Sequence, residues 1–152
     1  MITINTFMKS NEGFVPIAQF GGPVPNVDYI EGALTIDANG VSVIGVEACD
    51  YIDQLWCYII DALPKIHAGE SCRVYLPDQP ISIEFQPLSG RKTLLKVSIP
   101  GKEGASCAVD RQELVDQLKG AGSAFLLKMM DIVPELSDHW EQTKRQLDEA
   151  SC

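Results

Sequence analysis

Residues 50–66 (DYIDQLWCYIIDALPKI) constrain the fold of this chain more than any other segment. Large apolar side chains recur along it at the spacing of a single helix face, which predicts an amphipathic helix. They are Ile52, Leu55, Trp56, Ile59, Ile60 and Leu63. Each contributes about 1.5–3 kcal/mol when it is fully buried, so this face must pack against other elements. We therefore interpret Trp56 as a core residue in preference to an anchor for a ligand or partner.

The polar residues of this segment predict where the helix begins and ends. Asp50 is expected to cap its N-terminus, and Asp53 is expected in the first turn, where the helix dipole favours a carboxylate. Asp53 and Asp61 fall outside the apolar stripe and are expected in solvent. Pro64 has no backbone N–H to donate, which predicts a kink or a helix end near Leu63.

Two strands and a loop are predicted near the N-terminus. Residues 2–7 alternate apolar and polar side chains, and residues 14–20 follow a turn signal as a second strand. Pro16 places this second strand at a sheet edge, because proline cannot donate a hydrogen bond to a neighbouring strand. Residues 21–27 (GGPVPNV) are too rich in Gly and Pro for regular structure and predict a surface loop.

A hairpin is predicted between this loop and the central helix. Asn39-Gly40 favours a two-residue type I′ turn, which would join strands at residues 29–38 and 41–46. The register implied by this turn places Ala38 opposite Val41 and Ile36 opposite Val43. One face of the hairpin is then apolar, as a half-buried pair of strands requires.

Four more strands are predicted after the central helix. Apolar and polar residues alternate over residues 72–76, 81–86, 93–99 and, roughly, 105–109. Alternation of this kind is typical of strands with one face in the core and the other in water. Short turn signals separate these runs, so we predict an antiparallel meander.

Two helices are predicted at the C-terminus. Asp110 is expected to cap the first, with Glu113 three residues later as in a capping box. The small residues at 120–122 either allow close packing on the sheet or split this helix near Ser123. Pro134 begins the last helix, whose thin apolar stripe predicts a position at the surface.

These elements predict one domain over residues 1–152, a length that is ordinary for a single domain. Strands, a helix, more strands and then helices follow one another, which is the pattern of an α+β fold. We predict a mostly antiparallel meander sheet packed on the central helix (about residues 50–66) and on two C-terminal helices.

The charge of the chain is negative and unevenly distributed. The formal net charge is −9, and residues 10–64 contain no Lys or Arg. Eight acidic residues lie in that stretch: Glu12, Asp28, Glu31, Asp37, Glu47, Asp50, Asp53 and Asp61. An acidic surface can serve solubility alone, or it can attract a basic partner. The second interpretation assigns Asp28, Glu31 and Asp37 to partner binding. Under both interpretations the negative charge argues against direct binding of nucleic acid, which requires clustered Lys and Arg.

The cysteines and the N-terminus indicate a reducing, cytoplasmic setting. The five cysteines are Cys49, Cys57, Cys72, Cys107 and Cys152. Their number is odd and they form no CxxC pair, which disfavours a disulfide framework or a zinc site. The N-terminus lacks the pattern of a secretory signal, and no apolar run is long enough to span a membrane.

The sequence contains no recognisable catalytic set. His67 and His139 each lack a second ligand at metal spacing, and no nucleotide-binding loop or nucleophile motif occurs. We therefore expect no metal and no cofactor. The stretch Leu76-Pro77-Asp78-Gln79-Pro80 is the most distinctive local feature. It predicts either a rigid turn in which Asp78 accepts a backbone hydrogen bond, or a preformed polar pair, Asp78 and Gln79, for a ligand or partner.

Several residues together resemble small uncharacterised bacterial cytoplasmic proteins. They are Asp53, Leu55-Trp56 and Tyr58, then Pro77-Asp78-Gln79-Pro80-Ile81 and Phe85, then Leu118, Gly122 and Phe125 with Val133-Pro134. Some families of this size and acidity act as immunity proteins, which bind and neutralise a cognate toxin. The resemblance covers roughly residues 34–134, its motifs are mostly structural, and it transfers no catalytic residue.

These observations lead to three hypotheses. The first is a non-enzymatic binding protein, an immunity-like or antitoxin-like inhibitor of a basic partner. The second is a small-molecule-binding protein or enzyme, with a pocket between the sheet and the central helix that uses Asp78, Gln79, Tyr58 or Tyr75. The third is a structural homodimer, joined through an edge strand or the last helix.

Overall fold

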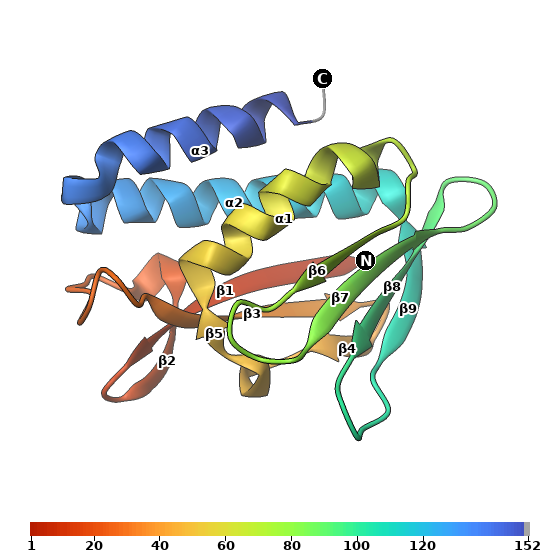
Figure 1. Cartoon of the computed structure of the whole chain (residues 1–152), viewed down its shortest axis with the longest axis horizontal. Coiled ribbons are helices and arrows are strands. Elements are labelled where there is room, and N and C mark those ends of the chain that lie inside the picture. The colour runs from red at the N-terminus through yellow and green to blue at the C-terminus, as the bar shows by residue number, and fades with distance from the viewer. Residues whose placement is uncertain (151–152) are drawn as a thin grey trace.

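The computed structural model describes residues 1–150, which fold into two antiparallel sheets and three long helices (Figure 1). The first sheet has the order β2-β1-β3-β4, with the short strand β5 paired to β3. Its strands are β1 (Ile2–Ser10), β2 (Gly13–Pro16), β3 (Glu31–Ala38), β4 (Val41–Ile44) and β5 (Asp50–Tyr51). The second sheet is a meander in chain order: β6 (Cys72–Tyr75), β7 (Ser82–Pro87), β8 (Lys92–Ser98) and β9 (Ser106–Asp110).

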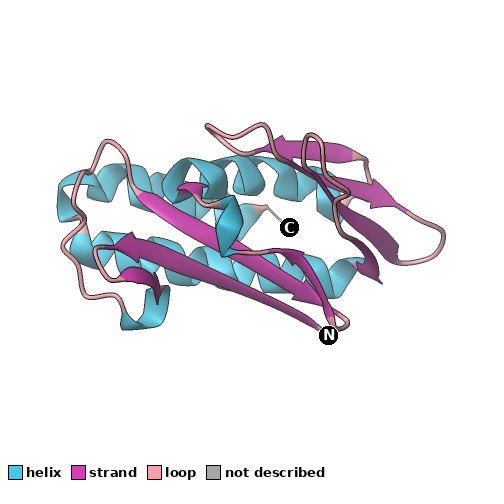
Figure 2. Cartoon of the chain, turned by 90° about the horizontal axis from the view of Figure 1, so that it is seen from below, coloured by secondary structure: helices cyan, strands magenta, loops and turns pink. Residues whose placement is uncertain are grey.

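The helices form a layer over one side of the two sheets. They are α1 (Ile52–His67), α2 (Arg111–Ile132) and α3 (Ser137–Glu149), and η1 (Ile17–Gln19), η2 (Val46–Ala48) and η3 (Pro134–Leu136) are single 3-10 turns. Figure 2 shows the strands nearer the viewer and the three long helices behind them. The predicted α+β class and the predicted antiparallel pairing are confirmed. The division of the strands into two sheets is a finding that the sequence pattern did not predict.

The core forms where α1 and α2 meet the two sheets, and α3 packs on these two helices. All six apolar residues of the predicted α1 stripe are buried, and Trp56 has no exposed surface, which confirms it as a core residue. Its indole Nε1 donates a hydrogen bond of 3.1 Å to the hydroxyl of Thr6 on β1. Its ring stacks on Phe125 of α2, which in turn meets Trp140 of α3 edge to face. One aromatic column therefore joins the three helices.

Gly122 allows this close approach of the helices. A Cβ atom at this position would lie 3.2 Å from the ring of Trp56 and 3.3 Å from a methyl group of Leu147. The helix α2 runs without interruption from Arg111 to Ile132, so the small residues do not split it near Ser123. They allow close packing instead, at Gly122 against the neighbouring helices α1 and α3.

The ends of α1 differ from the prediction. Asp50 does not cap the helix: Tyr51 occupies the N-cap position and no side chain makes a capping hydrogen bond. Pro64 lies inside the helix, which continues to His67, so an end near Leu63 is wrong. The helix tolerates Pro64 near its C-terminal end because the proline removes only one hydrogen bond of the ladder, and the buried stripe continues past it to Ile66.

The two acids of the α1 surface also differ from one another. Asp61 is exposed, as predicted. Asp53 is half-buried, and its Oδ1 atom is buried without a hydrogen-bond partner among residues 1–150. The prediction that Asp53 lies in solvent is therefore wrong, because the helix α3 covers this side of α1.

Two predicted strand details need correction in the first sheet. The second strand ends at Pro16 and continues as the 3-10 turn η1, although its edge position is confirmed. In the hairpin, Ala38 pairs with Val41 as predicted, but Ile36 pairs with Ile44 and not with Val43. A register shift between Ile36 and Asp37 causes this difference, since one extra residue of β4 is left without a direct partner.

The predicted N-cap of α2 is confirmed, but the reciprocal bond of the predicted capping box is not formed. The carboxylate of Asp110 accepts a hydrogen bond of 2.9 Å from the backbone N–H of Glu113. The side chain of Glu113 does not return to Asp110, but accepts a hydrogen bond of 3.1 Å from the backbone N–H of Ile2. This contact ties the start of β1 to the start of α2. Pro134 begins the turn η3, and the last helix itself starts at Ser137.

Candidate functional site

The candidate site lies at the end of the first sheet where β5 and the start of β3 meet the loop at residues 76–81. A hollow of about 280 Å³ opens there. It is lined by Glu31, Cys49, Asp50, Tyr51, Asp78 and Gln79. Three of these residues, Glu31, Asp78 and Gln79, belong to the binding residues that the sequence predicts. The structure therefore brings two separately predicted features into one place.

Asp50 builds this hollow by holding the loop in position. Its carboxylate accepts hydrogen bonds from the backbone N–H of Asp78 at 3.0 Å and of Gln79 at 2.9 Å. The side-chain amide of Gln79 donates a further hydrogen bond to the backbone carbonyl of Cys49. Asp50 is buried, with 8% of its surface exposed, so these bonds compensate for the removal of its charge from water.

This arrangement reverses the predicted hydrogen bond of the loop. The sequence predicts that Asp78 accepts a backbone hydrogen bond, but Asp78 instead donates its backbone N–H to Asp50. The side chain of Asp78 is exposed, and its carboxylate forms no hydrogen bond or ion pair within residues 1–150. The carboxylate of Asp78 is therefore available to a partner, whereas the amide of Gln79 is engaged in holding the loop.

Two tyrosines complete the site. The rings of Tyr29 and Tyr51 lie 5.5 Å apart and are tilted by 48° to one another. Tyr29 is 57% exposed. Partial desolvation raises the pKa of Tyr51, and the negative charges of Asp78 and Glu31 raise this pKa further.

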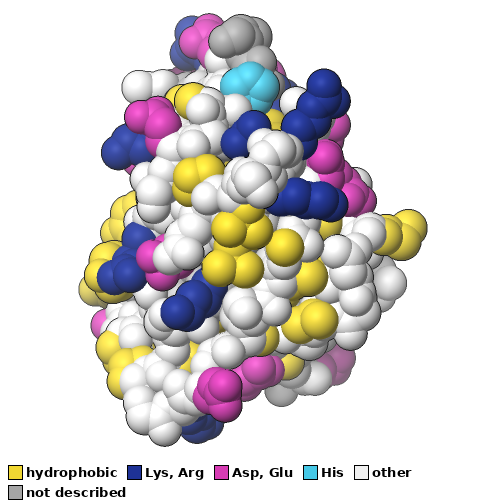
Figure 3. Space-filling view, turned by 90° about the vertical axis from the view of Figure 1, so that its right-hand side faces the viewer, with side chains coloured by type: hydrophobic (Ala, Val, Ile, Leu, Met, Phe, Trp, Pro, Cys, Tyr) yellow, Lys and Arg dark blue, Asp and Glu magenta, His cyan; other side chains and the backbone are white. Residues whose placement is uncertain are grey.

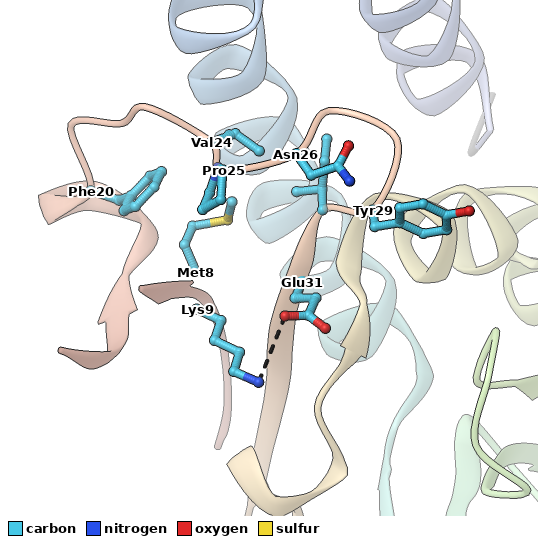
Figure 4. A pocket seen from close by; sticks show the side chains of 9 residues that line it. Met8, Lys9, Phe20, Val24, Pro25, Asn26, Tyr29 and Glu31 are labelled. Carbon is cyan, nitrogen blue, oxygen red and sulfur yellow. Dashed lines mark ion pairs between the residues drawn. The ribbon is translucent and has the colours of Figure 1, made fainter. Parts of the chain in front are cut away.

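A second hollow adjoins the first one at Glu31 (Figure 4). Its volume is about 230 Å³, and it is lined by Met8, Lys9, Phe20, Val24, Pro25, Asn26, Tyr29, Ile30 and Glu31. In Figure 4, Glu31 lies between Tyr29 on one side and the apolar side chains on the other. The Nζ atom of Lys9 lies 3.6 Å from Glu31, but both side chains are about half exposed, so this pair is weak and can open.

The predicted acidic residues do not all belong to this site. Asp28 is exposed in the loop beside Tyr29, where its backbone N–H bonds to the side chain of Asn26. Asp37 lies on β3 six residues beyond Glu31, which places it about 20 Å away along the strand. The acidic residues Asp28, Glu31 and Asp78 therefore gather at one end of the molecule, and Asp37 lies apart from them.

Sequence reasoning missed Tyr29 and Tyr51 as site residues. The sequence feature that could have identified them is that each directly follows an aspartate, Asp28 and Asp50 respectively. The two tyrosines are far apart in the chain, however, and only the pairing of Glu31 with Tyr51 between β3 and β5 brings their rings together. The other two predicted contact residues, Tyr58 and Tyr75, lie elsewhere, in a groove between α1 and β6.

Several basic residues lie on the second sheet, on β8 and on the turns beside it. The strand β8 carries Lys92 and Lys96, and Arg91 and Lys102 lie on the turns beside it. Figure 3 shows one side of the molecule, on which hydrophobic side chains lie among both basic and acidic ones. These basic residues belong to the second sheet, whereas Glu31 and Tyr51 of the candidate site lie on β3 and β5 of the first sheet.

Comparison with known protein families, curated proteins and solved structures finds no match for this chain. Its chemistry must therefore be argued from the residues themselves. Within residues 1–150, no group of three or more His, Cys, Asp or Glu side chains is placed to hold a metal ion. None of the helices in that range combines the length and the apolar character needed to cross a membrane.

The described cysteines are free thiols with no sign of activation. Cys49, Cys57, Cys72 and Cys107 are all half-buried and unpaired, and Cys152 lies outside the described residues. Burial raises the pKa of Cys57 to about 11, and the charges of Asp53 and Asp61 add to this effect. Since the thiolate is the reactive form, this raised pKa disfavours reaction of Cys57 at neutral pH.

Proposed function

We propose that this protein is a non-enzymatic binding module that captures a basic segment of a partner protein at the site around Glu31, Tyr51 and Asp78. The observation that carries the proposal is the hollow itself, which is lined by Tyr51 and by the carboxylate-bearing residues Glu31 and Asp78 and therefore has a negative potential. A hollow with this potential is built to receive positive charge.

An arginine side chain has the chemistry that fits this site best. Its planar guanidinium can form paired hydrogen bonds with a carboxylate such as that of Asp78 or Glu31. The same group can stack on a tyrosine ring, an interaction worth about 0.5–2 kcal/mol. Tyrosine is also enriched at the centres of protein interfaces, and Tyr29 presents 57% of its surface to solvent. The apolar hollow beside Glu31 would then receive a neighbouring side chain of the partner.

The overall charge supports the same conclusion at longer range. The chain carries a net charge of −9, and its acidic stretch from residue 10 to residue 64 supplies Asp28, Glu31 and the buried Asp50 of the site. Complementary charge steers partners together and mainly raises the association rate. Within this proposal the protein acts as an immunity-like or antitoxin-like inhibitor, which neutralises a basic partner by covering its functional surface. The four described cysteines are free, which suits a cytoplasmic site of action.

The test is capture of the partner with matched variants. The tagged protein is expressed in its native host, isolated at low salt, and its bound proteins are identified by mass spectrometry. We expect one stoichiometric basic partner that salt releases and that the double variant Glu31→Gln, Asp78→Asn no longer retains. The control is Asp37→Asn, which removes a charge from the same strand, β3, outside the site. Equal loss of the partner with the control would contradict the assignment of the site.

A small-molecule ligand is the alternative function for the same surface. The two adjoining hollows have volumes of about 280 and 230 Å³, which lie below the range of roughly 300–1,000 Å³ that is common for ligand pockets. Together they could hold a small cationic metabolite. A thermal-shift screen with such compounds separates the alternatives, since only this one predicts a stabilising hit.

A further inference from the structure

The strand β6 forms an open edge of the second sheet. It pairs with β7 on one side only. The backbone N–H of Leu76 donates to the carbonyl of Ile81 at 2.9 Å, so Leu76 faces β7. Backbone groups of an antiparallel strand alternate between its two sides, which means that Arg73 and Tyr75 direct their N–H and C=O groups away from β7. Two residues of β6 thus offer four backbone hydrogen-bonding groups at a free edge.

A groove of about 390 Å³ lies beside this edge, between α1 and β6. It is lined by Tyr58, Asp61, Ala62, Lys65, Cys72, Arg73, Val74 and Tyr75. Tyr58 is 43% exposed and Tyr75 is 58% exposed, so two aromatic rings border the open strand. Exposed edges of this kind are usually protected, because they pair readily with another strand.

We propose that a second copy of this chain occupies this edge, with the two β6 strands antiparallel across a two-fold axis at Val74. In this arrangement Arg73 lies opposite the partner subunit's Tyr75, and Tyr75 lies opposite the partner subunit's Arg73. All four free backbone groups of each strand are then paired, and the two four-stranded sheets become one continuous sheet. A two-fold interface of this type requires a self-complementary surface.

The sequence of β6 selects this register over its neighbours. A shift that sets Arg73 opposite the partner subunit's Arg73 brings two guanidinium groups together on one face of the sheet, which is unfavourable. A shift that sets Tyr75 opposite the partner subunit's Tyr75 pairs Arg73 with a proline, Pro77, which has no N–H to donate. Only the register centred on Val74 avoids both costs.

The charges on α1 are self-complementary in the same arrangement. Asp61 and Lys65 lie one helical turn apart and both line the groove. Lys65 is exposed and forms no ion pair within residues 1–150. In this arrangement the two α1 helices are antiparallel, and we place Asp61, which also accepts a hydrogen bond from the side chain of Gln146, near the partner subunit's Lys65. This pairing of opposite charges is the reason for choosing a second copy as the occupant.

Sedimentation velocity and equilibrium experiments on the full chain test the proposal. We expect a dimer of the 16.6 kDa chain in the wild type. Asp61→Lys and Lys65→Asp should each raise the Kd of the dimer about tenfold or more, because each sets like charges opposite one another. The double variant with both changes should restore the wild-type Kd, since it exchanges the charges without repulsion.

Tyr75→Arg is a second, independent variant, which sets two guanidinium groups opposite each other in the proposed register and should yield a monomer. Thermal unfolding followed by circular dichroism verifies that each variant is folded. Asp37→Lys is the control for Asp61→Lys, because it makes the same change in charge on β3 and should leave the dimer intact. A wild-type monomer at every concentration overturns the proposal. A dimer that is insensitive to Tyr75→Arg, or that the charge exchange fails to restore, overturns it as well.

Discussion

The carboxylate of Asp50, which directly precedes Tyr51 at the start of α1, accepts a hydrogen bond of 2.9 Å from the backbone N–H of Gln79. The two residues are 29 positions apart in the chain. This bond and its neighbour from Asp78 connect the first sheet to the loop that precedes β7. Asp50, which the sequence predicts as a helix cap, therefore holds the loop of the candidate site in position.

Replacement of Asp50 should consequently lower stability and loosen the loop. We expect Asp50→Ala to reduce the free energy of unfolding by about 2–4 kcal/mol, since it leaves two buried backbone N–H groups without an acceptor. Asp50→Asn keeps one acceptor oxygen and should cost less. Urea unfolding measures both values, and Asp116→Ala, at an exposed position on α2, is the control. Equal stability of Asp50→Ala and the wild type would contradict the anchoring role.

The glycines of α2 provide a matched pair for testing the helix packing. At Gly122 an added Cβ would lie 3.2 Å from Trp56 and 3.3 Å from Leu147, whereas at Gly120 nothing lies within 4 Å. We expect Gly122→Ala to destabilise the protein by about 1–3 kcal/mol through overpacking, offset in part by better helix propensity. Gly120→Ala should stabilise it by about 0.5–1 kcal/mol. Thermal or urea unfolding gives the sign of each change, and stabilisation by both variants would show that the helices can separate at no cost.

Asp53 should make stability depend on pH. Burial raises the pKa of its carboxyl above the ordinary value, and its Oδ1 atom has no hydrogen-bond partner among the described residues. A group whose pKa is raised on folding contributes most when it is protonated, so its contribution to stability is lost as the pH rises through this raised pKa.

We therefore expect Asp53→Asn to be more stable relative to the wild type at pH 7 than at about pH 3, because the wild-type carboxyl is more fully protonated at the lower pH. Chemical unfolding at the two pH values measures this difference. Asp37→Asn, an exposed residue on β3, serves as the control and should show no such gain at pH 7. A gain for Asp53→Asn that is equal at both pH values would rule out ionisation as its cause.

Charge reversal should distinguish the effect of the binding-site carboxylates on association from the effect of the protein's net charge. We expect Glu31→Lys and Asp28→Lys each to slow association with the basic partner about tenfold and to flatten the dependence of the rate on salt. Asp37→Lys makes the same change in net charge about 20 Å from Glu31 along β3, so its effect should be smaller. Stopped-flow or surface-based kinetics at several salt concentrations make the comparison. The same slowing by all three variants would indicate steering by net charge alone.

Local sequence patterns accounted for the elements whose formation depends on neighbours in the chain. The stripe from Ile52 to Leu63 repeats at the period of a helix, and the second sheet alternates at the period of a strand, so both were predicted with correct type. Asp110 was predicted as a cap because its partner, the N–H of Glu113, is only three residues away. Such interactions join residues within one helical turn, so a short stretch of sequence is enough to predict them.

The candidate site was predictable only in part, for the same reason. Glu31, Asp78 and Gln79 were identified individually, from the acidic stretch and from the two prolines of the loop. That they line one hollow together with Tyr51 follows from the pairing of β5 with β3, which no local pattern specifies.

The sequence by itself determined the α+β class, the amphipathic helix α1, the antiparallel meander and the absence of Lys and Arg from residue 10 to residue 64. Tertiary structure alone decided the division into two sheets, the role of Asp50, the burial of Asp53 and the separation of Asp37 from the acidic site. The physical reason is range: periodicity, capping and turn chemistry act between residues a few positions apart. The hydrogen bonds, burial and electrostatic fields that shape the site join residues that only the folded chain brings together.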